Sequence, residues 1–178
     1  MPKRPLLRAA ALLLALAAPS SAQEPNFGRA VALAGDDLLV GQPVNWYGPG
    51  AVYAYRLAAD GTWAERGLLT APDSARKDDF GGALALDGNT LVVAAPRKRD
   101  GSGVVYTYRR ASAKGAWQLE QVLEPPLEGD HTEYGAALAI SGDELLVGAP
   151  AVAGTGVVYR FTRDEEGGGL TSTLEPTA

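Results

Sequence analysis

The feature that most constrains this chain is a stretch of seventeen residues that occurs three times along it. The copies occupy residues 27–43, 80–96 and 134–150, so their starts lie 53 and 54 residues apart. They align without a gap, and seven of the seventeen positions carry the same residue in all three. A period of about fifty residues built from strand-like pieces is typical of a repeat architecture of the propeller kind.

Each unit has the pattern of four short strands. Residues 30–33 alternate between alanine and a branched side chain, which is the period of two expected of a strand. Gly35-Asp36 then places glycine first, as a type II′ hairpin turn requires, and the second strand ends at Pro43 because proline cannot donate to a ladder. A third strand at 50–55 carries two tyrosines on one face, and a fourth follows at 63–69.

The other two units repeat this order, so the sequence predicts an all-β fold of three four-stranded antiparallel sheets. Their second strands are expected at 91–94 and 145–148, their third at 103–108 and 156–161, and their fourth at 117–123 and 170–174. Such sheets are β-propeller blades. We expect the blades at about 27–71, 80–124 and 134–177, within a mature region of residues 23–178.

Three short motifs resemble the FG-GAP repeat, the unit of the integrin α-chain propeller and of many secreted bacterial proteins. They are the aromatic-Gly start, the Val-Gly-Ala-Pro close at 147–150 and the Gly-Val-Val-Tyr third strand at 103–106. The resemblance implies blades fanned about an axis, first strand innermost, in a ring that in this family usually has seven blades. Three blades do not close such a ring. We therefore expect an incomplete propeller, either a piece of a longer protein or copies that self-associate through exposed blade faces.

Many blades of this family hold calcium in an Asp-x-Asp-x-Asp-Gly loop between the first two strands. Here the corresponding links, 34–37, 87–90 and 141–144, have four residues each. Because Ca²⁺ takes 6–8 oxygen ligands, a link that short closes a hairpin and does not encircle the ion. The chain resembles the calcium-free branch of the repeat, and we expect no calcium, other metal or cofactor.

The first 22 residues have the pattern of a secretory signal peptide. A basic start is followed by an unbroken apolar run at 9–18 and by small residues before a cut after Ala22. A run of ten residues is too short to span a bilayer, which takes roughly 20 helical residues. The alternative is an uncleaved anchor. We expect a secreted, periplasmic or cell-surface protein without a membrane span after cleavage.

Composition narrows the chemistry. The net charge of −5 argues against a nucleic-acid partner, and a chain with no Cys and one His has few means of building a triad or a metal site. We expect no enzyme. The alternative, a glycoside hydrolase, would need two carboxyl groups flanking one bond, and the adjacent pairs Asp78-Asp79 and Glu165-Glu166 are more typical of solvated loops.

A binding function is the remaining class, with a protein or glycan as the ligand in an adhesion-like role. In a four-stranded meander the loops between second and third strands, and the links between blades, open on one side of the disc. Loops on a rigid scaffold are where binding residues collect, and Trp, Tyr and Arg dominate interface energetics. The candidate ligand-binding residues are Asn45, Trp46, Tyr47, Arg97, Lys98, Arg99 and His131. The alternative function is a structural segment that associates only with other blades.

Overall fold

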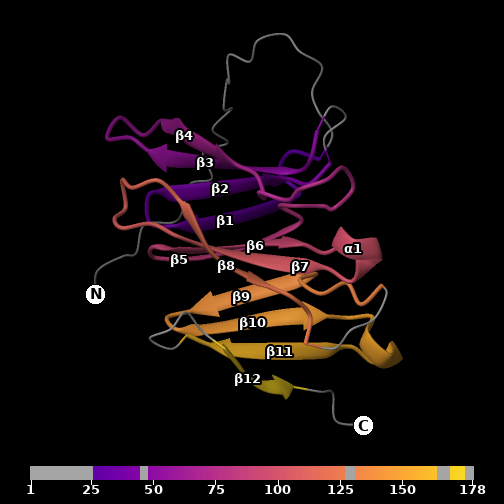
Figure 1. The fold of residues 1–178 in the computed structure, drawn as a ribbon. Coiled ribbons are helices and arrows are strands. Elements are labelled where there is room, and N and C mark those ends of the chain that lie inside the picture. Colours follow the sequence, from indigo (N-terminus) through magenta and orange to yellow (C-terminus); the bar gives the residue numbers. More distant parts are fainter. Residues whose placement is uncertain (1–25, 45–47, 127–130, 164–168, 175–178) are drawn as a thin grey trace, which may run out of the picture.

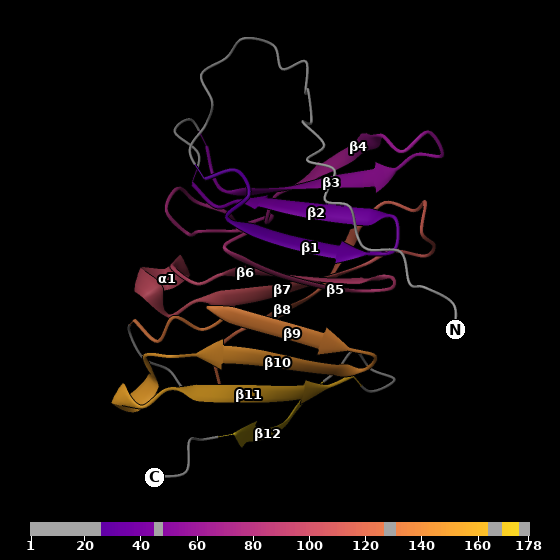
Figure 2. The ribbon, with the colours of Figure 1, turned by 180° about the vertical axis from the view of Figure 1, so that it is seen from behind.

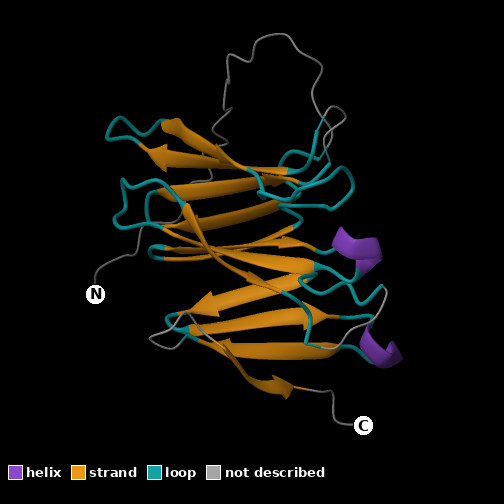
Figure 3. Cartoon of the chain, viewed as in Figure 1, coloured by secondary structure: helices purple, strands orange, loops and turns teal. Residues whose placement is uncertain are grey.

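The computed structural model describes residues 26–44, 48–126 and 131–163, and the backbone of 169–174. Figure 1 shows a stack of three sheets, and Figure 3 shows that strands make up almost all of their regular structure. The strand orders are β1-β2-β3-β4, β5-β6-β7-β8 and β12-β11-β10-β9, each pair antiparallel. The predicted all-β fold of three four-stranded antiparallel blades is confirmed.

Blade 1 consists of β1 (Ala30–Ala34), β2 (Asp37–Gln42), β3 (Ala51–Leu57) and β4 (Trp63–Leu69). Blade 2 consists of β5 (Ala83–Asp87), β6 (Thr90–Ala95), β7 (Val104–Arg109) and β8 (Gln118–Leu123). Blade 3 consists of β9 (Ala137–Ser141), β10 (Glu144–Ala149), β11 (Val157–Thr162) and β12 (Gly169–Leu174). Two single turns, α1 (Lys98–Gly101) and η1 (Val152–Gly154), lie between the second and third strands of blades 2 and 3.

The first hairpin of each blade closes through two residues. In blade 1 Ala34 pairs with Asp37, which leaves Gly35 and Asp36 as the turn. The backbone angle φ is +58°, +54° and +57° at Gly35, Gly88 and Gly142, whereas the residue after each glycine has a negative φ. A positive φ at the first turn position alone is the type II′ geometry, and it explains why glycine stands there in every copy.

Neighbouring blades pack face to face with their first strands β1, β5 and β9 innermost, in that order (Figures 1 and 2). We call the face that a blade turns toward the next blade its forward face, and the opposite one its back face. Blade 1 offers small and branched side chains on its forward face, including Ala32, Leu39 and Val52. Blade 2 meets them with a back face that includes Tyr106 and Tyr108. A second core joins blades 2 and 3 in the same way.

The aromatic-Gly pair that starts blades 2 and 3 locks each blade onto the one before it. Phe80 and Tyr134 have no solvent exposure. A Cβ atom at Gly50 would overlap the carbonyl oxygen of Phe80, and one at Gly103 would overlap that of Tyr134. Glycine is therefore required at the start of these third strands, because the backbone of the next blade lies directly against it.

The loops divide between two sides of the stack. The β1–β2, β5–β6 and β9–β10 turns lie on one side, and α1 and η1 lie on the other (Figure 3). This is the arrangement expected of a meander. Within the part of the chain that the structure describes, no helix is both long and apolar enough to cross a membrane.

Candidate functional site

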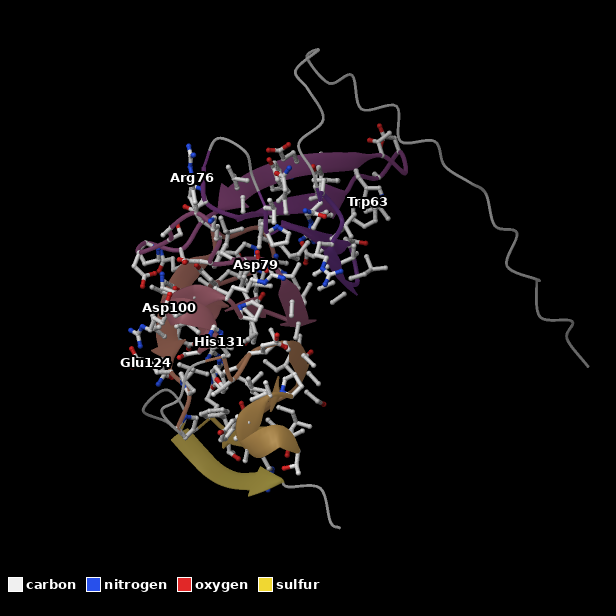
Figure 4. All side chains as sticks on the ribbon, turned by 90° about the vertical axis from the view of Figure 1, so that its right-hand side faces the viewer. Trp63, Arg76, Asp79, Asp100, Glu124 and His131 are labelled. Atoms are coloured by element: carbon white, nitrogen blue, oxygen red, sulfur yellow. The ribbon has the colours of Figure 1, made fainter. Side chains whose placement is uncertain are left out.

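The side of the stack that carries α1 holds Arg97, Lys98, Arg99 and His131, four of the seven ligand-binding residues predicted from the sequence. Asn45, Trp46 and Tyr47 lie outside the described residues. The remaining four occupy α1, its first flank and the link between blades 2 and 3. Figure 4 looks onto this side, with Asp79, Asp100, Glu124 and His131 spread over blade 2 and that link.

The basic triplet at 97–99 is engaged by carboxylates of its own blade and of the link that precedes it. Lys98 is only 8% exposed, and its Nζ lies 2.8 Å from Asp78 and 3.4 Å from Asp73. Arg97 and Arg99 pair with Asp79 at 3.1 Å and Glu124 at 2.7 Å. Lys98 is thus a buried strut that ties α1 to the segment before blade 2, and its role as a ligand-binding residue stays a prediction.

The environment of this strut sets the pKa values around it. Burial alone would raise the pKa of Asp73, but hydrogen bonds from Tyr106 and Lys98 bring it below its ordinary value. Burial, together with the bond to Asp73, raises the pKa of Tyr106 far above its ordinary value. Burial also raises the pKa of Asp79, which Arg97 offsets in part. The hydrogen bonds and ion pairs of these groups connect α1, β7 and the segment before blade 2.

His131 is exposed in the link that leads from blade 2 to blade 3. Its backbone has φ of +58°, and its ring lies close against Gly101. The residues that follow bind α1's flank: the Thr132 hydroxyl donates to the carbonyl of Ser102 at 2.7 Å, and the amide of Glu133 donates to that of Gly101 at 2.9 Å. His131 is thus accessible and lies beside Gly101 at the end of α1, but no described group of three or more metal-ligating side chains includes it.

A second site, which sequence reasoning did not find, lies between blades 1 and 2. It is a cleft of about 680 Å³ whose walls are β3 and β4 of blade 1 and the 113–117 turn of blade 2. That volume is within the range of small-molecule sites. The corresponding cavity between blades 2 and 3 measures about 30 Å³. Blade packing alone therefore does not produce a wide cleft, and the large volume is specific to the junction between blades 1 and 2.

The floor of the cleft is a network of one buried and two partly buried charged side chains. Asp37 accepts from two arginines, Arg110 at 2.5 Å and Arg56 at 3.1 Å. The Arg110 guanidinium also lies 4.3 Å from the centre of the Trp117 ring, a cation–π arrangement. Arg56 reaches across to blade 2 and donates to the carbonyl of Ala113 at 2.7 Å. These contacts hold the turn of blade 2 over blade 1 and fix the shape of the cleft.

The mouth of the cleft carries two further cations. Arg66 and Lys114 are exposed, and neither forms an ion pair within the described residues. The lining thus contains four cations and one carboxylate, a net charge of +3, in a chain whose total is −5. The lining also includes Tyr55 and Trp117. Such a cleft attracts anions and offers aromatic surface.

The comparisons with known proteins come from a family model and from solved structures. Residues 63–108 match the model of the FG-GAP repeat, which confirms the repeat recognised in the sequence; the integrin-like detail stays a prediction. No curated protein matches the chain.

Two solved structures are similar in fold. Sqt1 of Saccharomyces cerevisiae has a TM-score of 0.56 at 13% identity, over 86% of this chain and 37% of that one. A putative 6-phosphogluconolactonase from Bacteroides fragilis has a TM-score of 0.53 at 26% identity, over 79% of this chain and 36% of that one. The chain spans well under half the length of either structure. It is a β-propeller-like repeat module.

Proposed function

We propose that this FG-GAP repeat chain is an exported, non-catalytic binding module that holds an acidic saccharide in the cleft between blades 1 and 2. One observation carries the proposal: a cleft of about 680 Å³ with a net charge of +3 opens at one blade junction of an acidic chain. Export rests on the signal-peptide pattern of residues 1–22.

The residue types in the cleft fit a carboxylated or sulfated sugar. A guanidinium presents a planar fork of donors that matches a carboxylate or sulfate, as Arg66 can at the mouth. Trp117 offers ring surface for the apolar face of a sugar and an indole N–H for one of its hydroxyls. Opposite charge at the mouth also raises the rate of ligand capture.

The same lining supports binding rather than turnover. The carboxylate of Asp37 accepts hydrogen bonds from Arg56 and Arg110 and is thereby engaged within the protein. The described residues that line the cleft include no Cys or His. The neighbour described as a putative 6-phosphogluconolactonase suggests the contrary activity, hydrolysis of a phosphorylated sugar lactone. We expect no turnover of such a lactone above the uncatalysed rate.

The test is a calorimetric titration of the protein with three probes. These are an oligogalacturonate, the same oligosaccharide with its carboxyl groups reduced to alcohols, and a poly-glutamate peptide. We expect binding of the first probe alone. The double variant R66Q/K114Q should weaken that binding at least tenfold and leave the fold intact, because both side chains are exposed and neither forms an ion pair within the described residues. Tighter binding of the peptide would replace the saccharide with an acidic protein as ligand.

A matched control separates the cleft from the loop side. The variant R97Q/R99Q removes the same number of charges from the side that carries α1, where the sequence placed the binding residues together with Asn45–Tyr47. We expect this variant to bind the oligogalacturonate as the wild type does. Loss of binding in R97Q/R99Q, with R66Q/K114Q unaffected, would move the site to the loop side.

A second candidate function is a structural segment that associates only with other blades. It is favoured by apolar side chains exposed at both ends of the stack, among them Phe27 and Val158. A protein that binds none of the three probes but self-associates would fit this second function.

A further inference from the structure

The back face of blade 1 carries the aromatic-Gly pair Phe27-Gly28, and no blade among the described residues packs over it, whereas a preceding blade covers each of its two counterparts. Phe80 and Tyr134 occupy the equivalent positions of blades 2 and 3 and are both 0% exposed, whereas Phe27 is 46% exposed. Val31 and Leu33, on the same face, are 57% and 64% exposed. Their equivalents in blade 2, at 84 and 86, pack into the core between blades.

The pair at Phe27-Gly28 nevertheless has the geometry of a packed one. Its ring meets Tyr53 edge to face at 5.4 Å, as Phe80 meets Tyr106 at 5.4 Å. Gly28 has φ of +85°, close to +89° at Gly81, and its amide donates to Gly41 at 3.0 Å as that of Gly81 does to Ala94 at 2.9 Å. The surface is therefore pre-organised for the contact that the other two blades make.

The forward face of blade 3 is open in the complementary way. Val52 and Val105, which lie under the next blade, are 0% exposed, and their equivalent Val158 is 36% exposed. Gly50 and Gly103 lie against the aromatic-Gly backbone of the following blade. At their equivalent, Gly156, the three atoms nearest to an added Cβ all belong to Pro150 of its own blade.

We propose that a second copy of this chain joins the two faces, with Phe27-Gly28 of one copy packed against Gly156 and Val158 of the other. The occupant is argued from the two junctions inside the chain, which already join these same residue types in this register. The contact is head to tail, because the two surfaces differ. Two copies would supply six blades, within the 4–8 typical of closed propellers. The inference is independent of the cleft, since neither Phe27 nor Val158 lines it.

The test measures the mass of the full chain, expressed for export, by analytical ultracentrifugation over a dilution series. The variants are Phe27→Asp, which spoils one surface, and Val158→Arg, which spoils the other. Leu119→Asp is the matched control, since Leu119 is 40% exposed on the middle blade and on neither end face. We expect wild type and Leu119→Asp to associate, and each of the two end variants to be monomeric at the same concentrations.

Mixing the two end variants gives the sharpest outcome. The Phe27→Asp copy keeps an intact blade 3 surface and the Val158→Arg copy keeps an intact blade 1 surface. An equal mixture is therefore expected to form a one-to-one dimer that neither forms alone. Val31→Asp is a second probe of the blade 1 face should Phe27→Asp unfold, which circular dichroism would reveal.

Three results would overturn the proposal. The first is a wild type that stays monomeric throughout the series. The second is an association equal in wild type and both end variants. The third is an association lost with Phe27→Asp but kept with Val158→Arg, which would put another segment or another protein on the blade 1 face.

Discussion

Phe27 and Phe80 occupy the same position of the repeat, one exposed at the end of the stack and one buried between blades, so the same substitution can be compared in both. Phe80→Ala removes a ring that is 0% exposed between two blades, and Phe27→Ala removes one that is 46% exposed. A buried Phe→Ala change costs about 3–5 kcal/mol, because it loses the transfer free energy of the ring and leaves a cavity.

The smaller cost at Phe27 follows from its exposure. About half of the ring is buried, so about half of the roughly 1.5–3 kcal/mol for full burial is lost, and the space opens to solvent without a cavity. The expected loss for Phe27→Ala is therefore about 0.8–1.5 kcal/mol. The two variants should differ by at least ~1.5 kcal/mol in their free energy of unfolding.

Urea unfolding followed by tryptophan fluorescence measures this difference, at a dilution where the wild type is monomeric. With a slope of about 2 kcal/mol/M, the midpoint should fall by about 2 M for Phe80→Ala and by about 0.6 M for Phe27→Ala. Tyr134→Ala is the control and should resemble Phe80→Ala, since Tyr134 is also 0% exposed. Equal shifts for Phe27→Ala and Phe80→Ala would refute the assignment of the aromatic-Gly pair as an inter-blade lock.

Four further predictions concern individual residues. Asp78→Asn removes the carboxylate nearest to the buried Lys98 ammonium. The variant should lose about 3 kcal/mol of unfolding free energy, measured by urea titration. Tyr134→Phe should change that free energy by less than about 1 kcal/mol in either direction, because the buried hydroxyl has no hydrogen-bond partner among the described residues. The free energy of unfolding should fall as pH rises above about 10, because burial raises the pKa of Tyr106 and Tyr134 in the fold, whereas the same side chains ionise in the unfolded chain. Tyr134→Phe should make this decline shallower, which urea midpoints measured across that pH range would check. The exported protein should begin at Gln23, which intact-mass measurement would check.

The sequence predicted those parts of the fold that local chemistry decides. Glycine at the first turn position, alternation in residues 30–33 and proline after the second strand each constrain their own few residues, so the hairpins and the four-stranded blades could be recognised. The threefold recurrence of the unit then predicted that the blades stack, because units with the same apolar pattern can bury the same faces against one another. Tyr106 and Tyr108 are the blade 2 counterparts of the two tyrosines on one face of residues 50–55, and both are buried.

The sites depended on contacts between distant residues, which no local pattern carries. Lys98 stands between two arginines in the sequence and resembles part of a basic patch, but the fold brings Asp73 and Asp78 to it. The cleft requires the turn at 113–117 to reach Arg56, 57 residues from Ala113. Only the Gly-bearing turn before Trp117 was visible in the sequence, and nothing local indicates that it lies over the preceding blade.

The lock between blades also means that the cooperative folding unit is out of phase with the repeated sequence. Phe80 belongs to the second repeat by alignment, yet it completes the core on the first, against Gly50 and Val52. Stability should accordingly grow with the number of junctions rather than of blades, as in nearest-neighbour descriptions of repeat arrays. A blade excised at its repeat boundaries would have no junction and should not fold alone, while each blade added to the array should contribute one whole junction.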